Sequence, residues 1–329
     1  MRLITIKKFI NALKILISYF FSNHFKSYPL TALPFSLSIE PTTSCNLRCP
    51  ECPSGLRSFT RPTGMLNKNL YEKIIDEMSS TLIYLNFYFQ GEPYLHPSFL
   101  DMVNYASQRK IYTSTSTNAH YLNSENAKNT VLSGLNRIII SIDGTTQSVY
   151  EQYRIGGNLE KVTSGTKELV NWKKKLKSNT PHIVFQFLVV RPNEHQMEEV
   201  KLMAQELGVD EVSFKTAQLY EFENGHELMP ENEKYSRYKK LNNNSFELKN
   251  KLENHCWKMW HSAVITWDGD VVPCCFDKDA KHKMGSINHK SFKEIWFSNE
   301  YNNFRKAILQ SRKNIAICTN CSEGSLVHI

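Results

Sequence analysis

After residue 34 the chain alternates short apolar runs with longer amphipathic segments. The runs are rich in β-branched and aromatic residues, and the segments between them repeat apolar residues at helical spacing. Segments of this length supply the crossover helices that parallel strands need, so the pattern predicts a parallel-sheet α/β fold of six βα units. The predicted strands span residues 35–44, 82–89, 111–117, 137–143, 183–190 and 211–215, and the predicted helices 67–79, 97–109, 124–132, 159–177 and 197–207.

The first 34 residues carry a different pattern, that of one basic amphipathic helix. Apolar side chains recur at helical spacing at Phe9, Ile10, Leu13, Leu16, Ile17, Phe20 and Phe21, whereas Lys7, Lys8, Asn11, Lys14, Ser18 and Ser22 fall largely on the other side. The stretch is too short and too interrupted by Lys14 to predict a membrane span, and no small-residue cleavage site follows it. Two interpretations remain: a helix packed on the outside or bottom of the domain, or a peripheral anchor on the inner surface of the membrane.

Composition and charge indicate the cellular compartment of the protein and limit the classes of partner that we expect. A chain of 329 residues can bury the core of one large domain with a small one appended. Its eight cysteines, without a cleavable secretory signal, indicate a reducing compartment, so we expect a cytoplasmic protein, associated with the inner membrane if the anchor interpretation holds. The net charge of +8 is modest and the basic run at 173–177 continues a helix pattern, so we do not expect nucleic acid as a partner, although charge alone leaves tRNA open.

Three cysteines follow the first predicted strand in a C-x3-C-x2-C spacing. They are Cys45, Cys49 and Cys52. A structural zinc site usually closes with four ligands, whereas a cubane held by three thiolates leaves one iron free to bind something else. The spacing therefore indicates an iron–sulfur cluster with an open iron, with a zinc site or buried core cysteines as the alternative.

This spacing, directly after a strand, resembles the signature of the radical S-adenosylmethionine (SAM) superfamily. The resemblance implies a partial (β/α)6 TIM-type barrel, a [4Fe-4S] cluster on the three cysteines, and SAM chelated by the free iron. One electron from the cluster would then cleave SAM to a 5'-deoxyadenosyl radical, which leaves positioning, electron delivery and water exclusion to the protein. One departure is Glu51, where the family often has an aromatic residue; it makes the edge of the cluster more polar.

Further segments match the family's SAM contacts at the carboxyl ends of the predicted strands. Gln90-Gly91-Glu92-Pro93 resembles the GGEP motif, with Gln90 in place of the first glycine, and would place Gly91, Glu92 and Pro93 near the SAM ammonium. By the same resemblance Ser116 and Asn118 would lie near the ribose, and Ser141 and Arg154 near the SAM carboxylate. An ordinary turn, a β-prone serine–threonine run and a helix-capping arginine are the structural alternatives. Three more polar residues on the last two strands, Gln186, Arg191 and Lys215, are candidates for substrate or adenine contacts.

A second group of cysteines lies beyond the polar stretch 242–244, which we interpret as a surface loop or linker. The group contains Cys256, Cys274, Cys275, Cys318 and Cys321, and a hairpin at Asp268-Gly269 would present Cys274 to the C-x2-C pair. The arrangement resembles a SPASM domain in its shortened "twitch" form, which implies one auxiliary [4Fe-4S] cluster on Cys256, Cys274, Cys318 and Cys321. Cys275 is then a neighbouring thiol or an alternative ligand, and a four-cysteine zinc site is the other interpretation. The implied domains are an N-terminal helix at 1–34, the barrel at 35–245 and a small cysteine-rich auxiliary-cluster domain at 246–329.

The expected function is hydrogen-atom abstraction by a radical SAM oxidoreductase, with the auxiliary cluster accepting an electron from the substrate radical or steering it. A sugar, cyclitol or lipid-linked small molecule is favoured as substrate, because the resemblance implies a single auxiliary cluster and 34 residues are too few for a peptide-recognition domain. The alternative is maturation of a ribosomally made peptide by crosslinking or epimerisation. Hypotheses of other classes are a non-catalytic iron–sulfur redox or electron-transfer protein and a zinc-dependent binding module. A flavodoxin or ferredoxin-type reductant is the expected partner, and no pattern identifies a catalytic acid or base.

Overall fold

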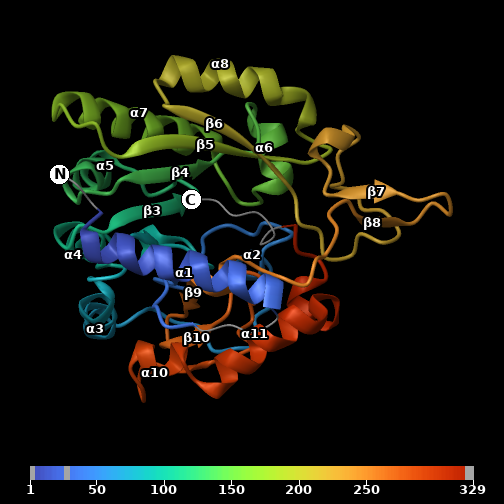
Figure 1. The fold of residues 1–329 in the computed structure, drawn as a ribbon. Coiled ribbons are helices and arrows are strands. Elements are labelled where there is room, and N and C mark those ends of the chain that lie inside the picture. The colour runs from blue at the N-terminus through green and yellow to red at the C-terminus, as the bar shows by residue number, and fades with distance from the viewer. Residues whose placement is uncertain (1–3, 26–29, 323–329) are drawn as a thin grey trace.

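The protein is built on an open, largely parallel sheet. The computed structural model describes residues 4–25 and 30–322 (Figure 1). Within these residues the first six strands lie in chain order, each parallel to the next, which confirms the predicted α/β fold class. The strands are β1 (Ser36–Ile39), β2 (Tyr84–Asn86), β3 (Tyr112–Thr117), β4 (Arg137–Ser141), β5 (His182–Val189) and β6 (Glu211–Thr216).

Helices connect these strands and cover the outer face of the sheet (Figure 1). Asparagine side chains begin several of them: Asn67, Asn123 and Asn158 each accept a hydrogen bond from a backbone N–H of the first turn. The crossover helices are α3 (Lys68–Met78), α4 (Phe99–Gln108), α5 (Ser124–Leu132), α7 (Leu159–Lys175) and α8 (Met197–Leu207), and short 3₁₀ turns lie at η1 (Pro93–Leu95) and η2 (Glu194–Gln196).

Three local details differ from the predicted elements. The second strand spans only Tyr84–Asn86, not residues 82–89. The first strand ends at Ile39 instead of residue 44, because Pro41 has no N–H to continue the ladder. A helix that the sequence analysis did not predict, α6 (Gln147–Tyr153), follows β4. Its seven residues are too few to show a helical period, and it delivers Arg154 at its carboxyl end.

The C-terminal region continues the same sheet past β1. Its first strand, β9 (Ser262–Ile265), pairs in parallel with β1, and β10 (Asp270–Val272) and β11 (Gly285–Ser286) extend the sheet by antiparallel pairing. The expected hairpin at Asp268-Gly269 is present, and Gly269 adopts the positive φ of 87° that its turn requires. Both regions also share one apolar core. The helices of this region are α9 (Lys258–His261), α10 (Phe292–Trp296) and α11 (Asn299–Ser311), followed by the turns η4 (Arg312–Asn314) and η5 (Ala316–Cys318).

A small hairpin projects from the molecule between the two regions (Figure 1). It consists of β7 (Tyr238–Lys240) and β8 (Phe246–Leu248), preceded by η3 (Glu233–Tyr235). The predicted loop at 242–244 forms its exposed tip, where Asn244 has a positive φ of 64°. Asparagine tolerates this left-handed conformation better than most residues.

The N-terminal helix α1 (Ile6–Phe25) packs on the protein with its polar side inward. Lys8 donates to the carbonyl oxygen of Lys110 at 2.6 Å, and Asn11 exchanges two hydrogen bonds with the backbone of Leu33 at 2.7 and 3.3 Å. The helix is therefore attached to the protein as one interpretation expected, but most of its apolar side faces outward. No helix in the described residues is long and apolar enough to cross a membrane.

A buried ion pair joins the end of β1 to the C-terminal region. The Arg61 guanidinium donates to both carboxylate oxygens of Glu40, at 2.8 and 2.5 Å, and neither side chain is more than 5% exposed. Glu40 also accepts a hydrogen bond from the backbone N–H of Trp267, and Arg61 donates to the carbonyl of Lys278. These two side chains therefore hold the cysteine loop against the turn after β9.

We predict that Glu40→Gln lowers the free energy of unfolding by about 3–5 kcal/mol, because it leaves the buried Arg61 charge uncompensated. Urea unfolding measures this loss, and the double variant Glu40→Leu/Arg61→Met should recover part of it. The exposed pair Glu198–Lys201 supplies the control: Glu198→Gln should change stability by less than about 1 kcal/mol. Equal effects at Glu40 and Glu198 would contradict the assignment.

Candidate functional site: a three-cysteine pocket and a second cysteine group

The three cysteines of the C-x3-C-x2-C segment meet at one pocket at the carboxyl end of the sheet. Cys45, Cys49 and Cys52 all line this pocket, which has a volume of about 160 Å³, and none of them forms a disulfide. The short helix α2 (Pro53–Leu56) begins directly after Cys52 and ends the loop. Burial raises the pKa of the Cys45 thiol to about 11 and also raises the pKa of Cys49. Thiols in such surroundings become thiolates when a metal supplies the opposing charge, so the donor set fits a bound cluster.

The opposite wall is the segment after β2, which is bonded to the cysteine loop. Gly91 has a φ of 75°, and a Cβ there would lie only 2.1 Å from the carbonyl oxygen of Thr42, so this close approach requires glycine. Gly91 N–H donates to the hydroxyl of Ser54, and Glu92 N–H donates to the carbonyl of Ser44 at 2.8 Å. The two segments therefore hold each other's backbone in place around the pocket.

The Glu92 carboxylate is turned into the protein. It accepts hydrogen bonds from the N–H of Asn118 and the hydroxyl of Thr117, both at 2.8 Å, and from the N–H of Tyr94 at 3.2 Å. Burial raises the pKa of Glu92 to about 7 despite these donors. The side chain thus fixes the end of β3, and the backbone carbonyls of its segment are the acceptors left for a ligand's ammonium.

Four more predicted residues reach the same pocket from the ends of β3, β4 and α6. Ser116, Asn118, Ser141 and Arg154 all line it, as do Gly91 and Glu92, whereas Pro93 is buried beside it at the start of η1. Asn118 donates to the Asn46 side chain at 2.8 Å, which is a contact inside the cysteine loop. The structure therefore brings six of the seven predicted SAM contacts to the three cysteines.

Arg154 is held by a carboxylate that the sequence analysis did not single out. Its Nε lies 2.5 Å from Oδ2 of Asp143, and its Nη1 lies 3.6 Å from the Sγ of Cys49. Asp143 is fully buried and also accepts a hydrogen bond from the N–H of Leu188. Its position directly after a buried strand was the available signal, because a charge there needs a partner.

The remaining candidates lie elsewhere. Gln186 is half-buried on β5, Arg191 is exposed and donates to the carbonyl of Met229, and Lys215 is exposed on β6. None of the three lines the cysteine pocket. Their roles stay predictions.

Glu51, the departure from the family pattern, binds the projecting region. Its carboxylate accepts a hydrogen bond from the N–H of Tyr220 at 3.0 Å and lies 3.3 Å from Nε2 of His226. The polar residue at this position thus attaches the cysteine loop to the segment that leads into the β7–β8 hairpin.

The second cysteine group gathers in the C-terminal region. Cys256, Cys318 and Cys321 are buried and Cys274 is half-buried. Burial, and then the neighbouring thiols of Cys275, Cys256 and Cys318, raise the pKa of Cys274.

A buried arginine completes this second group. Arg312 donates to the Sγ of Cys321 at 3.2 Å and to the carbonyl of His255.

In the described part of the chain no three Cys, His, Asp or Glu side chains lie close enough to hold one metal ion. The prediction for each group is a four-iron cluster, in which each thiolate binds a different iron.

Cys275 adjoins Cys274 and also contacts an apolar cluster. It packs with Phe89 against a small apolar cluster, and Lys258 Nζ lies 3.7 Å from its Sγ. Phe89 also lines the three-cysteine pocket, so these two side chains lie between the two cysteine groups. Phe89 and Tyr88 line the pocket without having been predicted, since nothing in an apolar strand marks the residues that face a ligand.

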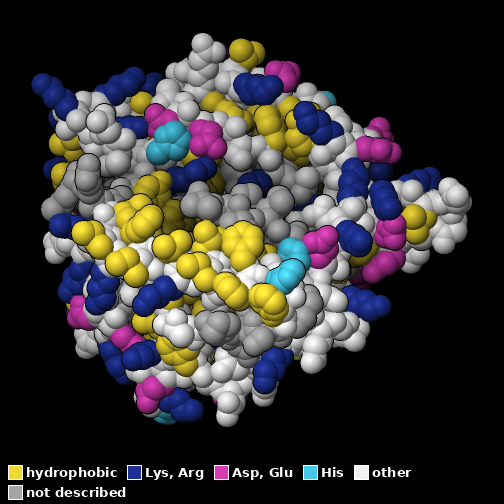
Figure 2. Space-filling model, in the orientation of Figure 1, with side chains coloured by type: hydrophobic (Ala, Val, Ile, Leu, Met, Phe, Trp, Pro, Cys, Tyr) yellow, Lys and Arg dark blue, Asp and Glu magenta, His cyan; other side chains and the backbone are white. Residues whose placement is uncertain are grey.

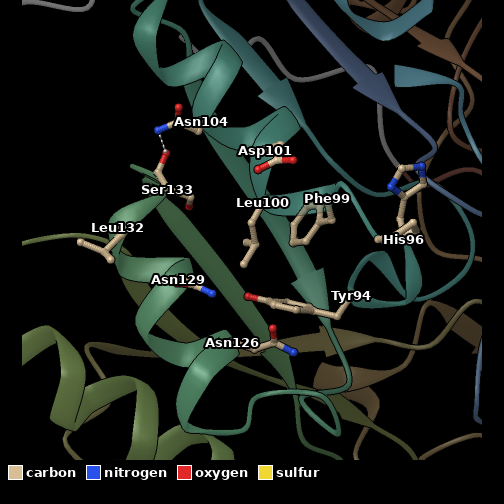
Figure 3. Close-up of a pocket in the computed structure, with 11 residues that line it drawn as sticks. Tyr94, His96, Phe99, Leu100, Asp101, Asn104, Asn126, Asn129, Leu132 and Ser133 are labelled. Carbon is tan, nitrogen blue, oxygen red and sulfur yellow. Dashed lines mark hydrogen bonds between the residues drawn. The ribbon is translucent and has the colours of Figure 1, made fainter. Parts of the chain in front are cut away.

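A larger cavity of about 550 Å³ lies away from both groups, between α4 and α5 (Figure 3). Tyr94 and Phe99 form one wall, and Asn104 donates to the carbonyl of Ser133 across the top of the view (Figure 3). None of the predicted site residues lines it. Volume by itself does not mark the functional site of this protein.

Comparison with known proteins agrees with this geometry and defines the class. The radical SAM superfamily profile matches residues 39–204, more than half of the chain, and the profile of the SPASM iron–sulfur cluster-binding domain matches residues 256–322. The chain belongs to the radical SAM superfamily and carries a SPASM domain. It is accordingly a radical SAM enzyme that uses SAM, a [4Fe-4S] cluster and auxiliary iron–sulfur chemistry.

Individual relatives are more distant. A tungsten-containing aldehyde ferredoxin oxidoreductase cofactor-modifying protein of Pyrococcus furiosus is 29% identical, over 87% of this chain and 86% of its own. The mycofactocin maturase MftC of Mycobacterium ulcerans is 33% identical, but the match covers only 38% of this chain and 33% of the maturase. The solved structure of BtrN in complex with AdoMet and 2-DOIA has a TM-score of 0.54 at 18% identity, covering 88% of this chain and 94% of BtrN, and so shares the fold.

We predict that Glu92 makes the stability of the protein depend on pH. The pKa of its carboxyl is raised from 4.5 to about 7 on folding, so its contribution to stability is complete at acid pH and is lost as the pH rises through about 7. Urea unfolding measures the free energy of unfolding of both proteins at about pH 5 and at about pH 8. Between these pH values it should fall in wild type by on the order of 3 kcal/mol more than in Glu92→Gln. Parallel pH profiles for the two proteins would refute the shift.

We also predict that Arg312 raises the reduction potential of a cluster bound by the second cysteine group. Arg312→Gln should lower the midpoint potential by on the order of 50 mV, since its charge stabilises the more negative, reduced state. A redox titration followed by EPR measures this in a Cys45→Ala/Cys49→Ala/Cys52→Ala background, where the first cluster is absent. The control is Lys313→Gln, which removes the exposed charge of the next residue and should leave the potential unchanged.

Proposed function

We propose that this radical SAM enzyme modifies a ribosomally made peptide, by forming a crosslink or an epimer after hydrogen-atom abstraction. The observation that carries the proposal is the SPASM domain, joined to the barrel through the parallel pairing of β9 with β1. Part of this chain is similar to the mycofactocin maturase MftC, at 33% identity over 38% of the chain. Peptide maturation was the alternative hypothesis from the sequence, and the comparisons favour it over the small-molecule hypothesis.

The cysteines would hold the groups that supply the chemistry. Cys45, Cys49 and Cys52 would ligate the cluster that binds SAM, and the second group would ligate one auxiliary cluster. When bound, the first cluster and SAM supply the 5'-deoxyadenosyl radical that removes hydrogen from the substrate. The pocket fits this use because three thiols that form no disulfide share its wall with a backbone that approaches closely at Gly91.

The other residues of the pocket would bind and orient SAM. The carbonyls of the Gly91 segment would accept hydrogen bonds from the SAM ammonium. Arg154 stays charged because Asp143 faces it, so its guanidinium adds a fixed positive charge beside the cysteine loop. Glu92 would act indirectly, because its carboxylate positions the backbone of Asn118. A flavodoxin or ferredoxin-type protein would deliver the electron.

A second candidate function is oxidation of a sugar, cyclitol or lipid-linked small molecule. The specific observation in its favour is the share of the chains that aligns. The Pyrococcus furiosus protein, whose name describes modification of a cofactor, aligns along most of both chains, whereas the match to the maturase MftC is partial. Both functions use the same radical and differ in the substrate that donates the hydrogen.

We predict that 5'-deoxyadenosine acquires deuterium from a peptide. The reconstituted enzyme with SAM and dithionite would be incubated with extract of the source organism grown in deuterated medium, divided into peptide, small-molecule and lipid fractions. Mass spectrometry of 5'-deoxyadenosine should show deuterium with the peptide fraction, and protease treatment of that fraction should abolish it. Deuterium from a protease-resistant fraction would instead support the second candidate.

The matched control is the variant Cys45→Ala/Cys49→Ala/Cys52→Ala, which should form at most trace 5'-deoxyadenosine with any fraction. Its auxiliary cysteines are unchanged, so retained auxiliary iron shows that the variant has folded. Failure of the wild-type enzyme, with both clusters present, to cleave SAM at all would reject the whole proposal.

A further inference from the structure

The outward side of α1 is an apolar stripe that the protein itself does not cover. Figure 2 shows hydrophobic side chains running along this helix across the face of the molecule. Six of them, Phe9, Ile10, Leu13, Ile17, Phe20 and Phe21, are between 44% and 61% exposed. Soluble surfaces rarely present so many large apolar side chains in one row, so the stripe marks an interaction surface. We define these six residues as the α1 stripe.

The attachment of α1 fixes this orientation. Lys8 and Asn11 are buried and bonded to the backbone of Lys110 and Leu33 on the inward side. Further along the helix, Tyr19 is buried against the rings of Trp257 and Trp260. Turning the helix to bury the stripe would leave these polar groups and this aromatic contact unpaired, so the apolar side stays outward.

The charges that α1 and its flanking residues carry are of one sign. Residues 1–39 contain no Asp or Glu, and their basic residues are Arg2, Lys7, Lys8, Lys14 and Lys26. Lys7 and Lys14 are exposed on α1 itself. A basic helix with a row of Phe, Ile and Leu has the composition of helices that lie in the interface of an anionic membrane.

A hollow at the amino end of α1 adds a second feature of this kind. It has a volume of about 460 Å³ and is lined by Ile6, Ile10, Thr31 and Thr81, with Lys7 and Lys14 beside them. A small apolar hollow next to two ammonium groups suits an acyl chain with its anionic headgroup.

We propose that α1 binds the protein to the surface of a membrane that contains anionic lipid, with the α1 stripe inserted among the acyl chains and Lys7 and Lys14 at the headgroups. A second copy of this chain fits the stripe less well, because it would bring the same lysines and no carboxylate from α1 to the interface. The inference stands apart from the proposed substrate, because it rests on residues that do not line the cysteine pocket.

Vesicle co-sedimentation of the full chain tests the proposal. The reconstituted protein should sediment with phosphatidylcholine vesicles that contain phosphatidylglycerol, and more weakly with phosphatidylcholine alone. Phe9→Gln/Phe20→Gln should reduce binding about tenfold or more, because two large apolar side chains no longer leave water. Lys7→Gln/Lys14→Gln should remove the preference for phosphatidylglycerol, and added salt should do the same to wild type.

The matched control is Leu132→Gln/Leu202→Gln, which removes two leucines that are 55% and 60% exposed on α5 and α8. It should bind vesicles like wild type, and all variants should keep the circular dichroism spectrum of wild type. The proposal would be overturned if wild-type protein bound neither kind of vesicle. It would also be overturned if the control lost as much binding as Phe9→Gln/Phe20→Gln. A dimer that Phe9→Gln/Phe20→Gln dissociates, without any vesicle binding, would assign the stripe to a second copy.

Discussion

The buried pair of Glu40 and Arg61 is the interaction on which the arrangement of this protein depends. Glu40 is the first residue after β1, where the cysteine loop begins, and Arg61 lies on the far side of that loop. Both also bond to backbone of the C-terminal region, at Trp267 and Lys278. A buried charge pair tolerates little displacement, because each ion loses water that only its partner replaces. The pair therefore holds the loop and the SPASM domain in one geometry.

The pocket itself follows the same principle of buried charges with fixed partners. Asp143 holds Arg154 beside the cysteine loop, and three donors hold the Glu92 carboxylate at the end of β3. These groups set the positions of the pocket walls before any cofactor binds. A radical enzyme needs such preorganisation, since its protein must position the reacting groups and exclude water while the cofactor performs the chemistry.

The sheet runs continuously through both regions of the protein. Because β9 lies beside β1, the cysteine-rich C-terminal region belongs to the same sheet as the barrel strands, with Phe89 and Cys275 between the two cysteine groups. The α1 helix has a role separate from this region. Its buried polar residues attach it to the protein, and most of its apolar residues face outward.

The sequence by itself determined the fold class, the two cysteine groups and most of the pocket, because strand runs, C-x3-C-x2-C spacing and the Gly91 segment are local patterns whose meaning does not depend on distant residues. Only the tertiary structure decided the partners of charged residues. Asp143 and Arg312 acquire their roles from contacts with Arg154 and Cys321 that no spacing along the chain encodes. The same holds for α1: its periodicity predicted an amphipathic helix, but which side faces inward depends on bonding groups at Leu33 and Lys110, which folding brings beside it.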